Sequence, residues 1–292
     1  KPALAEFKPY VFFAVPLILT KLMEESIGEF IHSKSGAAKL ADYKNNPDFC
    51  RALSTIFMEA LGGNVGLFVT GGAAIPEQFE KLFVEQLNLP FVTGYGMTEA
   101  APTICLGHKG KYKLKECGEY VDECVDLKID SPDPEHIPGE ILIKGHVLFA
   151  GYYKNEEATR AVFTEDGWFR TGDLATMDKD HSVFIVGRSK SMILTPNGQN
   201  IYPEEIEVVL NALPGVAESL IVNRNDRLVA LIVPDQNQLG DMDASGLKSI
   251  MDANIDALNT KIPAYSHVSG YEIRFEPFVK TPKGSIRRFM YA

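Results

Sequence analysis

The fold is decided by the segment Thr93-Gly94-Tyr95-Gly96-Met97-Thr98-Glu99-Ala100, which follows a short apolar run, Leu89–Val92. Two glycines flank Tyr95, and glycine lets the backbone approach a ligand closely and adopt unusual dihedral angles. The apolar run has the length and composition of a buried strand. Ligands of open α/β sheets bind beyond the carboxyl ends of the strands, which is where this segment would lie. We therefore predict a ligand-binding loop here.

The residues before this segment have the pattern of a parallel sheet with helical connections. Val65–Val69 predicts a buried strand that ends at Gly71-Gly72, and Pro76 fits the first turn of a helix. The apolar stripe of that helix consists of Phe79, Leu82, Phe83 and Leu87. Strand, helix and strand in this order predict a βαβ unit.

Further towards the start, Val11–Val15 predicts another strand, and Pro16 opens a helix with apolar residues at helical spacing. The polar residues of His32–Asp48 predict a looser stretch after that helix.

The sequence changes character twice beyond the central segment. From Gly118 to Gly187, short β-like runs alternate with Gly, Pro and Asp turns, which predicts a small β-rich subdomain. After Arg188, two helices, Pro203–Leu213 and Leu247–Ile262, flank a hairpin that turns at residues 223–226. We therefore predict two domains, residues 1–189 and residues 190–292, with the boundary at Lys190.

Bulk composition narrows the classes of partner. The chain has 292 residues, enough for two domains, and its net charge of −10 argues against a nucleic-acid partner. The apolar run Tyr10–Leu19 is too short to span a bilayer. The four cysteines form no CxxC pair and have no histidine at zinc spacing. We interpret them as reduced thiols of a cytoplasmic protein.

The central segment carries groups suited to a nucleotide. Tyr95 can present its ring to an adenine, and Thr98 can donate a hydrogen bond to a phosphate. Glu99 can hold Mg²⁺, a hard cation that prefers carboxylate oxygens. The alternative is a Gly-rich turn with a core tyrosine and a solvated glutamate.

Two later segments supply complementary groups. Asp173, in Gly-Trp-Phe-Arg-Thr-Gly-Asp-Leu, follows a glycine turn and can accept hydrogen bonds from ribose hydroxyls. Arg188 opens a segment that runs to Glu207, and its guanidinium fork suits oxyanions. We interpret the acids of this segment as residues stabilised by the dipole of a helix N-terminus: Glu204, Glu205 and Glu207.

Taken together and in this order, the three segments resemble the adenylate-forming superfamily of acyl-CoA synthetases, luciferases and peptide-synthetase adenylation domains. The resemblance covers nearly the whole chain, from about Lys8 to the end. It implies an α/β fold. The first domain would be the C-terminal part of an AMP-binding domain, with a βαβ layer and a small β-rich subdomain. A mobile α+β lid domain would follow.

The resemblance also implies a role for each matching residue. The nucleotide-binding positions would be Gly71, Gly72, Ala73, Gly94, Tyr95, Gly96, Thr98, Asp173 and Arg188. Among them, Tyr95 would stack on adenine, Thr98 would contact the phosphate and Asp173 would bind ribose, while Glu99 would hold Mg²⁺. Lys190 would be the hinge of the lid. The channel for the pantetheine arm of CoA would be lined by Gly198.

The implied reaction has two steps and uses ATP, Mg²⁺ and CoA. An acid is first adenylated with release of pyrophosphate, and a thiol then attacks the acyl-AMP after the lid swings. The stretch Leu61–Phe83 looks most like long-chain fatty acyl-CoA synthetases, with medium-chain or aryl acids as alternatives. A lipid substrate would allow peripheral contact with a membrane. The resemblance also allows a ligase that loads a carrier protein, or a non-catalytic nucleotide- or acyl-binding relative.

The sequence departs from the family pattern at two places. The Ser/Thr/Gly-rich loop that grips the β- and γ-phosphates is not found near Lys1, so we expect a C-terminal portion of a longer enzyme that makes no adenylate alone. The family's catalytic lysine position is occupied by Ser285. Lys283 and Arg287 each lie two positions away, and we favour Lys283 as the substitute cation. The next alternative is that no residue substitutes directly.

Overall fold

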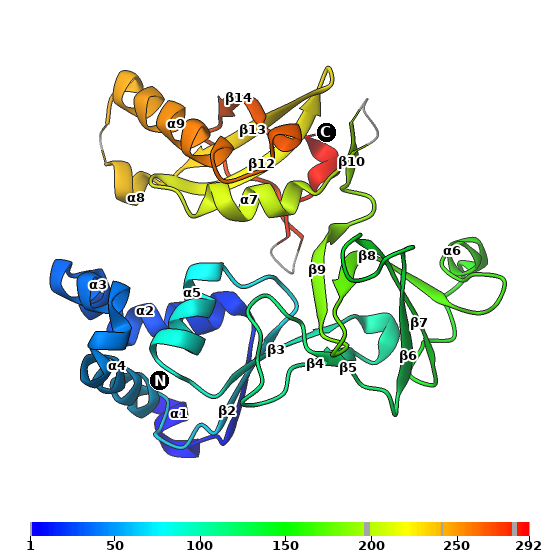
Figure 1. The fold of residues 1–292 in the computed structure, drawn as a ribbon, viewed down its shortest axis with the longest axis horizontal. Helices are drawn as coiled ribbons and strands as arrows, with labels where there is room; N and C mark the ends of the chain where they lie inside the picture. Colours follow the sequence, from blue (N-terminus) through cyan, green and yellow to red (C-terminus); the bar gives the residue numbers. More distant parts are fainter. Residues whose placement is uncertain (1, 196–198, 241, 282–284, 292) are drawn as a thin grey trace. The chain divides into compact units, whose positions relative to one another are not determined.

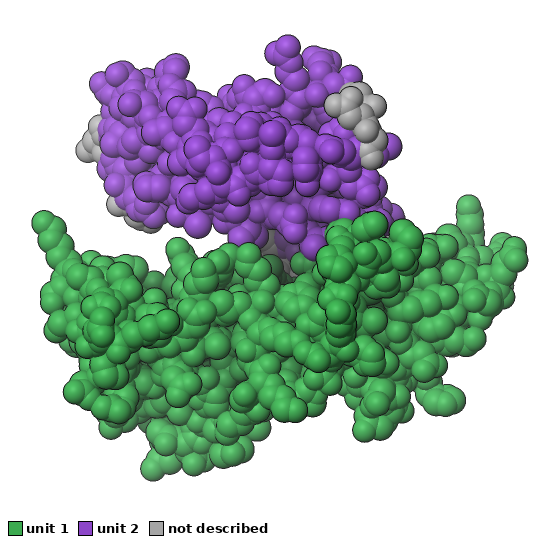
Figure 2. All heavy atoms as spheres, in the orientation of Figure 1, with its two compact units in different colours: residues 1–171, 175–185 green, residues 172–174, 186–292 purple. Residues whose placement is uncertain are grey.

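The computed structural model describes residues 2–195, 199–240, 242–281 and 285–291 (Figure 1). It divides into two compact units, which Figure 2 colours separately. The first unit consists of Lys1–Thr171 with Ala175–Ile185, and the second consists of Gly172–Leu174 with Val186–Ala292. Within the described ranges, every helix is too short or too polar to cross a lipid bilayer.

The first unit contains a five-stranded sheet with the order β1-β2-β3-β4-β5. Its strands are β1 (Val11–Ala14), β2 (Leu67–Gly71), β3 (Phe91–Gly96), β4 (Thr103–Leu106) and β5 (Glu119–Tyr120). The first three strands run parallel, whereas β4 and β5 are antiparallel to their neighbours. Between β2 and β3 the chain forms α5 (Glu77–Lys81) and one π-helical turn, η2 (Leu82–Gln86). The βαβ prediction is therefore confirmed.

The helices of the N-terminal region lie beside the strands β2 and β3 in Figure 1. They are α1 (Pro2–Phe7), α2 (Pro16–His32), α3 (Lys34–Ala41) and α4 (Pro47–Ala60), with a 3₁₀ turn, η1 (Tyr43–Asn45). The prediction of a looser stretch over His32–Asp48 is wrong. The Ser33 hydroxyl accepts a hydrogen bond from the Gly36 amide, and this cap starts a helix that buries Leu40.

The core of this region is a row of aromatic rings between the helices and the sheet. Phe57 of α4 lies 5.7 Å from Phe68 of β2 and 6.1 Å from Phe83 of η2, measured between ring centroids. Phe83 in turn lies 5.6 Å from Phe91 of β3. Such contacts stabilise a core beyond the area that they bury. They pack α4 and η2 against β2 and β3.

A second sheet of the order β6-β7-β8-β9 follows, as predicted for a β-rich subdomain. Its strands are β6 (Val125–Asp130), β7 (Gly139–Gly145), β8 (Phe169–Met177) and β9 (Val183–Arg188), with the helix α6 (Glu156–Ala161) between β7 and β8. Its apolar core includes Ile141, Ile143 and Phe169, each almost fully buried. The turn η3 (Thr98–Ala100) connects the end of β3 to β4.

The second unit is an α+β module with its own core. Its strands are β10 (Ile193–Leu194), β11 (Asn200–Ile201), β12 (Val216–Arg224), β13 (Arg227–Pro234) and β14 (Val268–Ile273). Its helices are α7 (Pro203–Asn211), α8 (Gln236–Leu239) and α9 (Ala244–Asn259), with the 3₁₀ turns η4 (Ala264–Ser266) and η5 (Arg288–Met290). The hairpin prediction is confirmed. Asn225 and Asp226 have φ angles of 52° and 61° between β12 and β13, which suit a tight two-residue turn.

The outermost strand of the five-stranded sheet is apolar and open to solvent. Among the described residues, β1 pairs with β2 alone. Phe13 on this strand is 75% exposed, and Leu17, just after it, is 74% exposed. All four cysteines are free thiols.

Candidate functional site

Two of the predicted glycine segments meet at the carboxyl edge of the parallel strands. Gly71 at the end of β2 is the register partner of Gly94 in β3. A Cβ atom on Gly71 would lie 2.6 Å from the Gly94 carbonyl oxygen, so the end of β2 leaves no room for a side chain there. Gly72 has a φ of +79° and, like Ala73, is exposed. The chain therefore turns at Gly72, directly after the end of β2 that pairs with Gly94 of the central segment.

More of the central segment belongs to a β-strand than its two glycines indicate. The expectation that the strand ends at Val92 is wrong, because β3 continues to Gly96. Tyr95 pairs with Cys105 of β4, and an irregularity in register follows between Tyr95 and Gly96. A Cβ atom on Gly96 would lie 1.7 Å from the Pro102 carbonyl oxygen. The glycine therefore permits a close approach of two backbone segments of this chain.

The side chains of this segment differ in their surroundings. Tyr95 is half-buried and packs against the apolar core of the β-rich subdomain. Thr98 is exposed, and Glu99 is half-buried in the turn η3. The Thr98 hydroxyl and the Glu99 carboxylate thus belong to adjacent residues beyond the end of β3.

Glu99 is held at two points by residues 149–152, which its local sequence pattern does not include. Its carbonyl oxygen accepts a hydrogen bond from the Phe149 amide at 2.8 Å. Its Oε1 atom accepts one from the Tyr152 hydroxyl at 3.0 Å. Burial, followed by this hydrogen bond, raises the pKa of Tyr152 above its ordinary value. No local pattern could have revealed Tyr152, because 53 residues separate it from Glu99.

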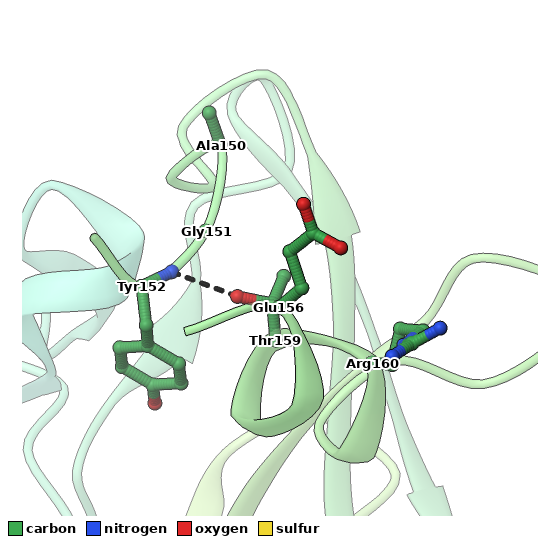
Figure 3. Close-up of a pocket in the computed structure, with 6 residues that line it drawn as sticks. All are labelled: Ala150, Gly151, Tyr152, Glu156, Thr159 and Arg160. Carbon is green, nitrogen blue, oxygen red and sulfur yellow. Dashed lines mark hydrogen bonds between the residues drawn. The ribbon is translucent and has the colours of Figure 1, made fainter. Parts of the chain in front are cut away.

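Beside Tyr152 the surface forms a hollow of about 360 Å³. Its lining, drawn in Figure 3, consists of Ala150, Gly151, Tyr152, Glu156, Thr159 and Arg160. The dashed line in Figure 3 marks the Tyr152 amide, which donates to the Thr159 hydroxyl at 2.9 Å. The Tyr152 hydroxyl points away from Thr159. The hollow is thus formed by the turn that carries Tyr152 and the helix α6.

The second unit brings the other two predicted nucleotide residues together. Arg188 Nε lies 3.0 Å from Asp173 Oδ1. The Asp173 side chain is 7% exposed, whereas the Arg188 side chain is 70% exposed. Gly172 has a φ of +75°, and its carbonyl oxygen accepts a hydrogen bond from the Ser189 amide at 2.9 Å. This turn places a buried carboxylate beside an accessible guanidinium, a pair that can bind hydroxyl and phosphate oxygens.

The acids of α7 divide into two kinds. Glu204 and Glu205 lie in its first turn, as predicted. The dipole interpretation is wrong for Glu207, which is buried and accepts a hydrogen bond from the Ile221 amide at 2.7 Å. Its Oε2 atom lies 2.8 Å from Arg288 Nη1. Burial raises the pKa of Glu207, and the guanidinium opposes that rise. Glu207 therefore anchors the C-terminal segment to α7.

The remaining predicted residues follow Arg188 in the sequence. Lys190 is exposed. Gly198 and Lys283 lie outside the described residues. Ser285 and Arg287 are exposed, and the Ser285 carbonyl oxygen accepts a hydrogen bond from the Thr281 amide at 2.8 Å.

Comparison with known proteins assigns the chain to a family. A family model described as "AMP-binding enzyme" matches residues 2–153, and one described as "AMP-binding enzyme C-terminal domain" matches residues 190–291. The chain belongs to the AMP-binding enzyme family, which confirms the resemblance to adenylate-forming proteins.

Among its relatives are ligases of two acid classes. The long-chain-fatty-acid–CoA ligase FadD13 of Mycobacterium tuberculosis is 35% identical over 184 residues, which cover 60% of this chain and 36% of that protein. A feruloyl-CoA synthase of an Amycolatopsis species is 37% identical over 161 residues, covering 53% of this chain and 32% of that protein. The chain thus spans about a third of the length of these relatives.

The fold is also found in solved structures. The o-succinylbenzoate CoA synthetase of Bacillus subtilis, in complex with its acyl-adenylate intermediate, superposes with a TM-score of 0.73 at 20% identity. The match covers 98% of this chain and 51% of that chain. The expected α/β fold of the adenylate-forming type is therefore confirmed.

Proposed function

We propose that the protein to which this chain belongs activates a fatty acid with ATP and transfers the acyl group to CoA. The observation that carries the proposal is the Gly94–Glu99 segment. It ends a parallel strand beside Gly71 and presents Thr98 and Glu99 in a chain of the AMP-binding family. Because the chain spans about a third of the length of its curated relatives, the activity is proposed for the whole protein.

The side chains fit distinct parts of an acyl-adenylate. The Tyr95 ring would lie against adenine, and Asp173 with Arg188 would bind ribose and phosphate oxygens. Thr98 would donate to the α-phosphate. The backbone of the two glycine segments would allow the nucleotide to approach: Gly71, Gly72, Ala73, Gly94 and Gly96.

Glu99 is the proposed Mg²⁺ ligand. Among the described residues, no cluster of three or more His, Cys, Asp or Glu side chains gathers to hold a metal ion. A single carboxylate nevertheless fits Mg²⁺, which commonly keeps several waters and is bound by one or two carboxylates together with substrate phosphates. When bound, the ion would neutralise charge that develops on the phosphate.

The second unit would act as the lid, with its boundary at residues 189 and 190 and its hinge at Lys190. The family model that begins at residue 190 supports this division. Gly198 would line the pantetheine channel. Lys283 would supply the cation that the family pattern places at Ser285, with Arg287, whose side chain is exposed, as the alternative.

A long-chain fatty acid is the proposed substrate, since FadD13 carries that substrate class in its name. An aryl acid is the alternative, because the relative named for feruloyl-CoA is similar to the same degree. A carrier protein is a second candidate for the acceptor. A protein that binds nucleotide or acyl groups without catalysis is a second candidate for the class. We also propose a cytoplasmic location, with peripheral membrane contact for a lipid substrate.

The test uses the complete open reading frame that encodes this chain. Pyrophosphate release is measured with ATP, Mg²⁺ and a series of fatty and aryl acids, and thioester formation is then measured with CoA. We expect release only with an acid, and most with long-chain fatty acids. Release that does not depend on an acid, or none with any acid, would overturn the proposal.

Variants in the same assay test the residue roles. Asp173→Asn removes a charged acceptor worth about 1.5–3 kcal/mol, so the KM for ATP should rise roughly ten- to hundredfold. Asp166→Asn, on an exposed turn, is the matched control. Lys283→Ala and Arg287→Ala separate the two candidate cations, and the proposal requires the larger loss of adenylation from Lys283→Ala.

A further inference from the structure

We propose that Tyr152 is a positioning residue for Glu99: its hydroxyl holds one carboxylate oxygen and so directs the other towards the cation and the phosphate. The inference rests on the proposed function, since it concerns the residue proposed to bind the metal ion. It adds a residue from a different segment, beyond β7, which the sequence motifs did not include.

The contacts of Glu99 leave its two oxygens in different situations. Oε1 accepts the hydrogen bond from the Tyr152 hydroxyl at 3.0 Å. For Oε2, the described part of the chain provides no hydrogen-bond donor or cation. Because the Phe149 amide also holds the Glu99 carbonyl oxygen at 2.8 Å, the residue is fixed at both its backbone and its side chain. One oxygen is thus held by the protein, and the other is left for a ligand.

Tyr152 is itself fixed by its neighbours. Its ring meets the Phe149 ring edge-on, with centroids 4.8 Å apart and planes at 71°. Phe149 in turn contacts the ring of Phe169, which is 1% exposed, at 5.6 Å. The Tyr152 amide donates to the Thr159 hydroxyl (Figure 3). A side chain at Gly151 would come within 2.9 Å of Thr159, so the turn is closely packed. These ring contacts therefore connect Tyr152, which is 36% exposed, to the core of the β-rich subdomain.

A hydrogen-bond partner such as Tyr152 can strengthen metal binding without coordinating the metal, because it orders the carboxylate that does. The Glu99 side chain has three rotatable bonds, and a carboxylate that must be ordered at the moment of binding loses rotamer entropy. Hydrogen bonds to metal-binding carboxylates orient them, and removing such a partner typically costs about 10–100-fold in metal affinity or activity. We expect a loss of this size when the Tyr152 hydroxyl is removed.

The chain offers a matched control at the next residue. Tyr153 is 88% exposed, and its ring lies 5.2 Å from Lys154 Nζ. Tyr152→Phe and Tyr153→Phe each remove one hydroxyl and keep the ring. Because the Phe149 contact is made by the ring of Tyr152, the first variant should keep the packing and lose only the hydrogen bond to Glu99.

The experiment measures Mn²⁺ binding to the full-length protein in saturating AMP, from the electron paramagnetic resonance signal of free Mn²⁺. Tyr152→Phe should raise the Kd for Mn²⁺ about tenfold or more. Tyr153→Phe should leave it unchanged, and Glu99→Gln should remove the site. In the pyrophosphate assay, Tyr152→Phe should raise the Mg²⁺ concentration at half-maximal rate in the same proportion. Thermal unfolding of each variant checks that the fold is kept.

The outcomes separate the two proposals. If Tyr152→Phe binds Mn²⁺ as tightly as the wild type while Glu99→Gln does not, the positioning role is overturned and the metal site stands. If Glu99→Gln binds Mn²⁺ as the wild type does, the proposed metal site is overturned, and the role of Tyr152 with it.

Discussion

Gly96 has no space for a side chain, whereas Gly72 is constrained only by its backbone angle. An added Cβ atom at Gly96 would lie 1.7 Å from the Pro102 carbonyl oxygen, a contact that requires the backbone to move. Gly72 has a φ of +79°, but nothing lies within 4 Å of an added Cβ atom. Gly96 is therefore required for steric reasons, whereas Gly72 is required for its backbone conformation.

We expect Gly96→Ala to lower the free energy of unfolding by roughly 3 kcal/mol, as overpacking does at its upper range. Gly72→Ala should cost about 1 kcal/mol, the usual penalty for a left-handed L-residue. Urea unfolding followed by circular dichroism measures both. Equal losses in the two variants would contradict the close approach at Gly96.

At the scale of single residues, the sequence predicts candidate ligand-binding groups such as Glu99, but not the groups that hold them in the structure. Glu99 stands in a segment whose local pattern is distinctive. Tyr152 is identified only by its contact with Glu99, 53 residues away. Contacts of that kind depend on the packing of β-strands, which a local pattern does not contain.

The helix α5 is tied to the loop before β5 by a buried acid. Glu80 is 1% exposed and accepts hydrogen bonds from the Tyr112 hydroxyl and, at 2.7 Å, from the Lys115 amide. Burial raises the pKa of Glu80 and Glu77 adds to the rise, while Tyr112 and Lys115 oppose it. This acid connects the helix of the βαβ unit to the antiparallel part of the sheet.

The raised pKa predicts a pH-dependent stability. The folded state binds the Glu80 proton more tightly than the unfolded state, in which the pKa of this carboxyl group is near 4.5. The free energy of unfolding should therefore fall as the pH rises from about 4.5 towards the raised pKa. Glu80→Gln keeps an acceptor but cannot titrate, so this contribution should disappear. Urea titrations of both proteins over this range test it, and parallel curves would rule it out.

At the scale of elements, the type of structure was easier to predict than its ends. The strand before the central segment was expected to stop at Val92, yet β3 continues to Gly96 because β4 pairs with it. The helix α3 is not predicted because it has only 8 residues, and its cap at Ser33 is a single hydrogen bond. Neighbouring strands and caps set these limits.

At the scale of the whole molecule, the second unit has the parts of an independent domain. Val186–Ala292 contains a three-stranded sheet and two apolar cores. Arg288 connects three segments of this unit, since its guanidinium donates hydrogen bonds to the Glu207 carboxylate at 2.8 Å and to the Ile221 carbonyl oxygen at 3.1 Å. All three residues belong to this unit.

We therefore expect residues 190–292 to fold alone and unfold cooperatively in urea. Arg288→Met leaves a buried carboxylate without its partner, which typically costs about 3–5 kcal/mol. The loss should be the same in the isolated piece and in the complete chain. Arg287→Met, at an exposed neighbour, should change stability by no more than about 0.5 kcal/mol. Noncooperative unfolding of the piece would contradict this division.

The open strand β1 has a consequence for handling the protein. In the part of the chain that the structure describes, β1 pairs with β2 alone, and the Phe13 and Leu17 side chains beside its open edge are exposed. An uncovered apolar edge of this kind is a template on which another strand can add. Prepared as this chain alone, the protein should self-associate at β1 as its concentration rises.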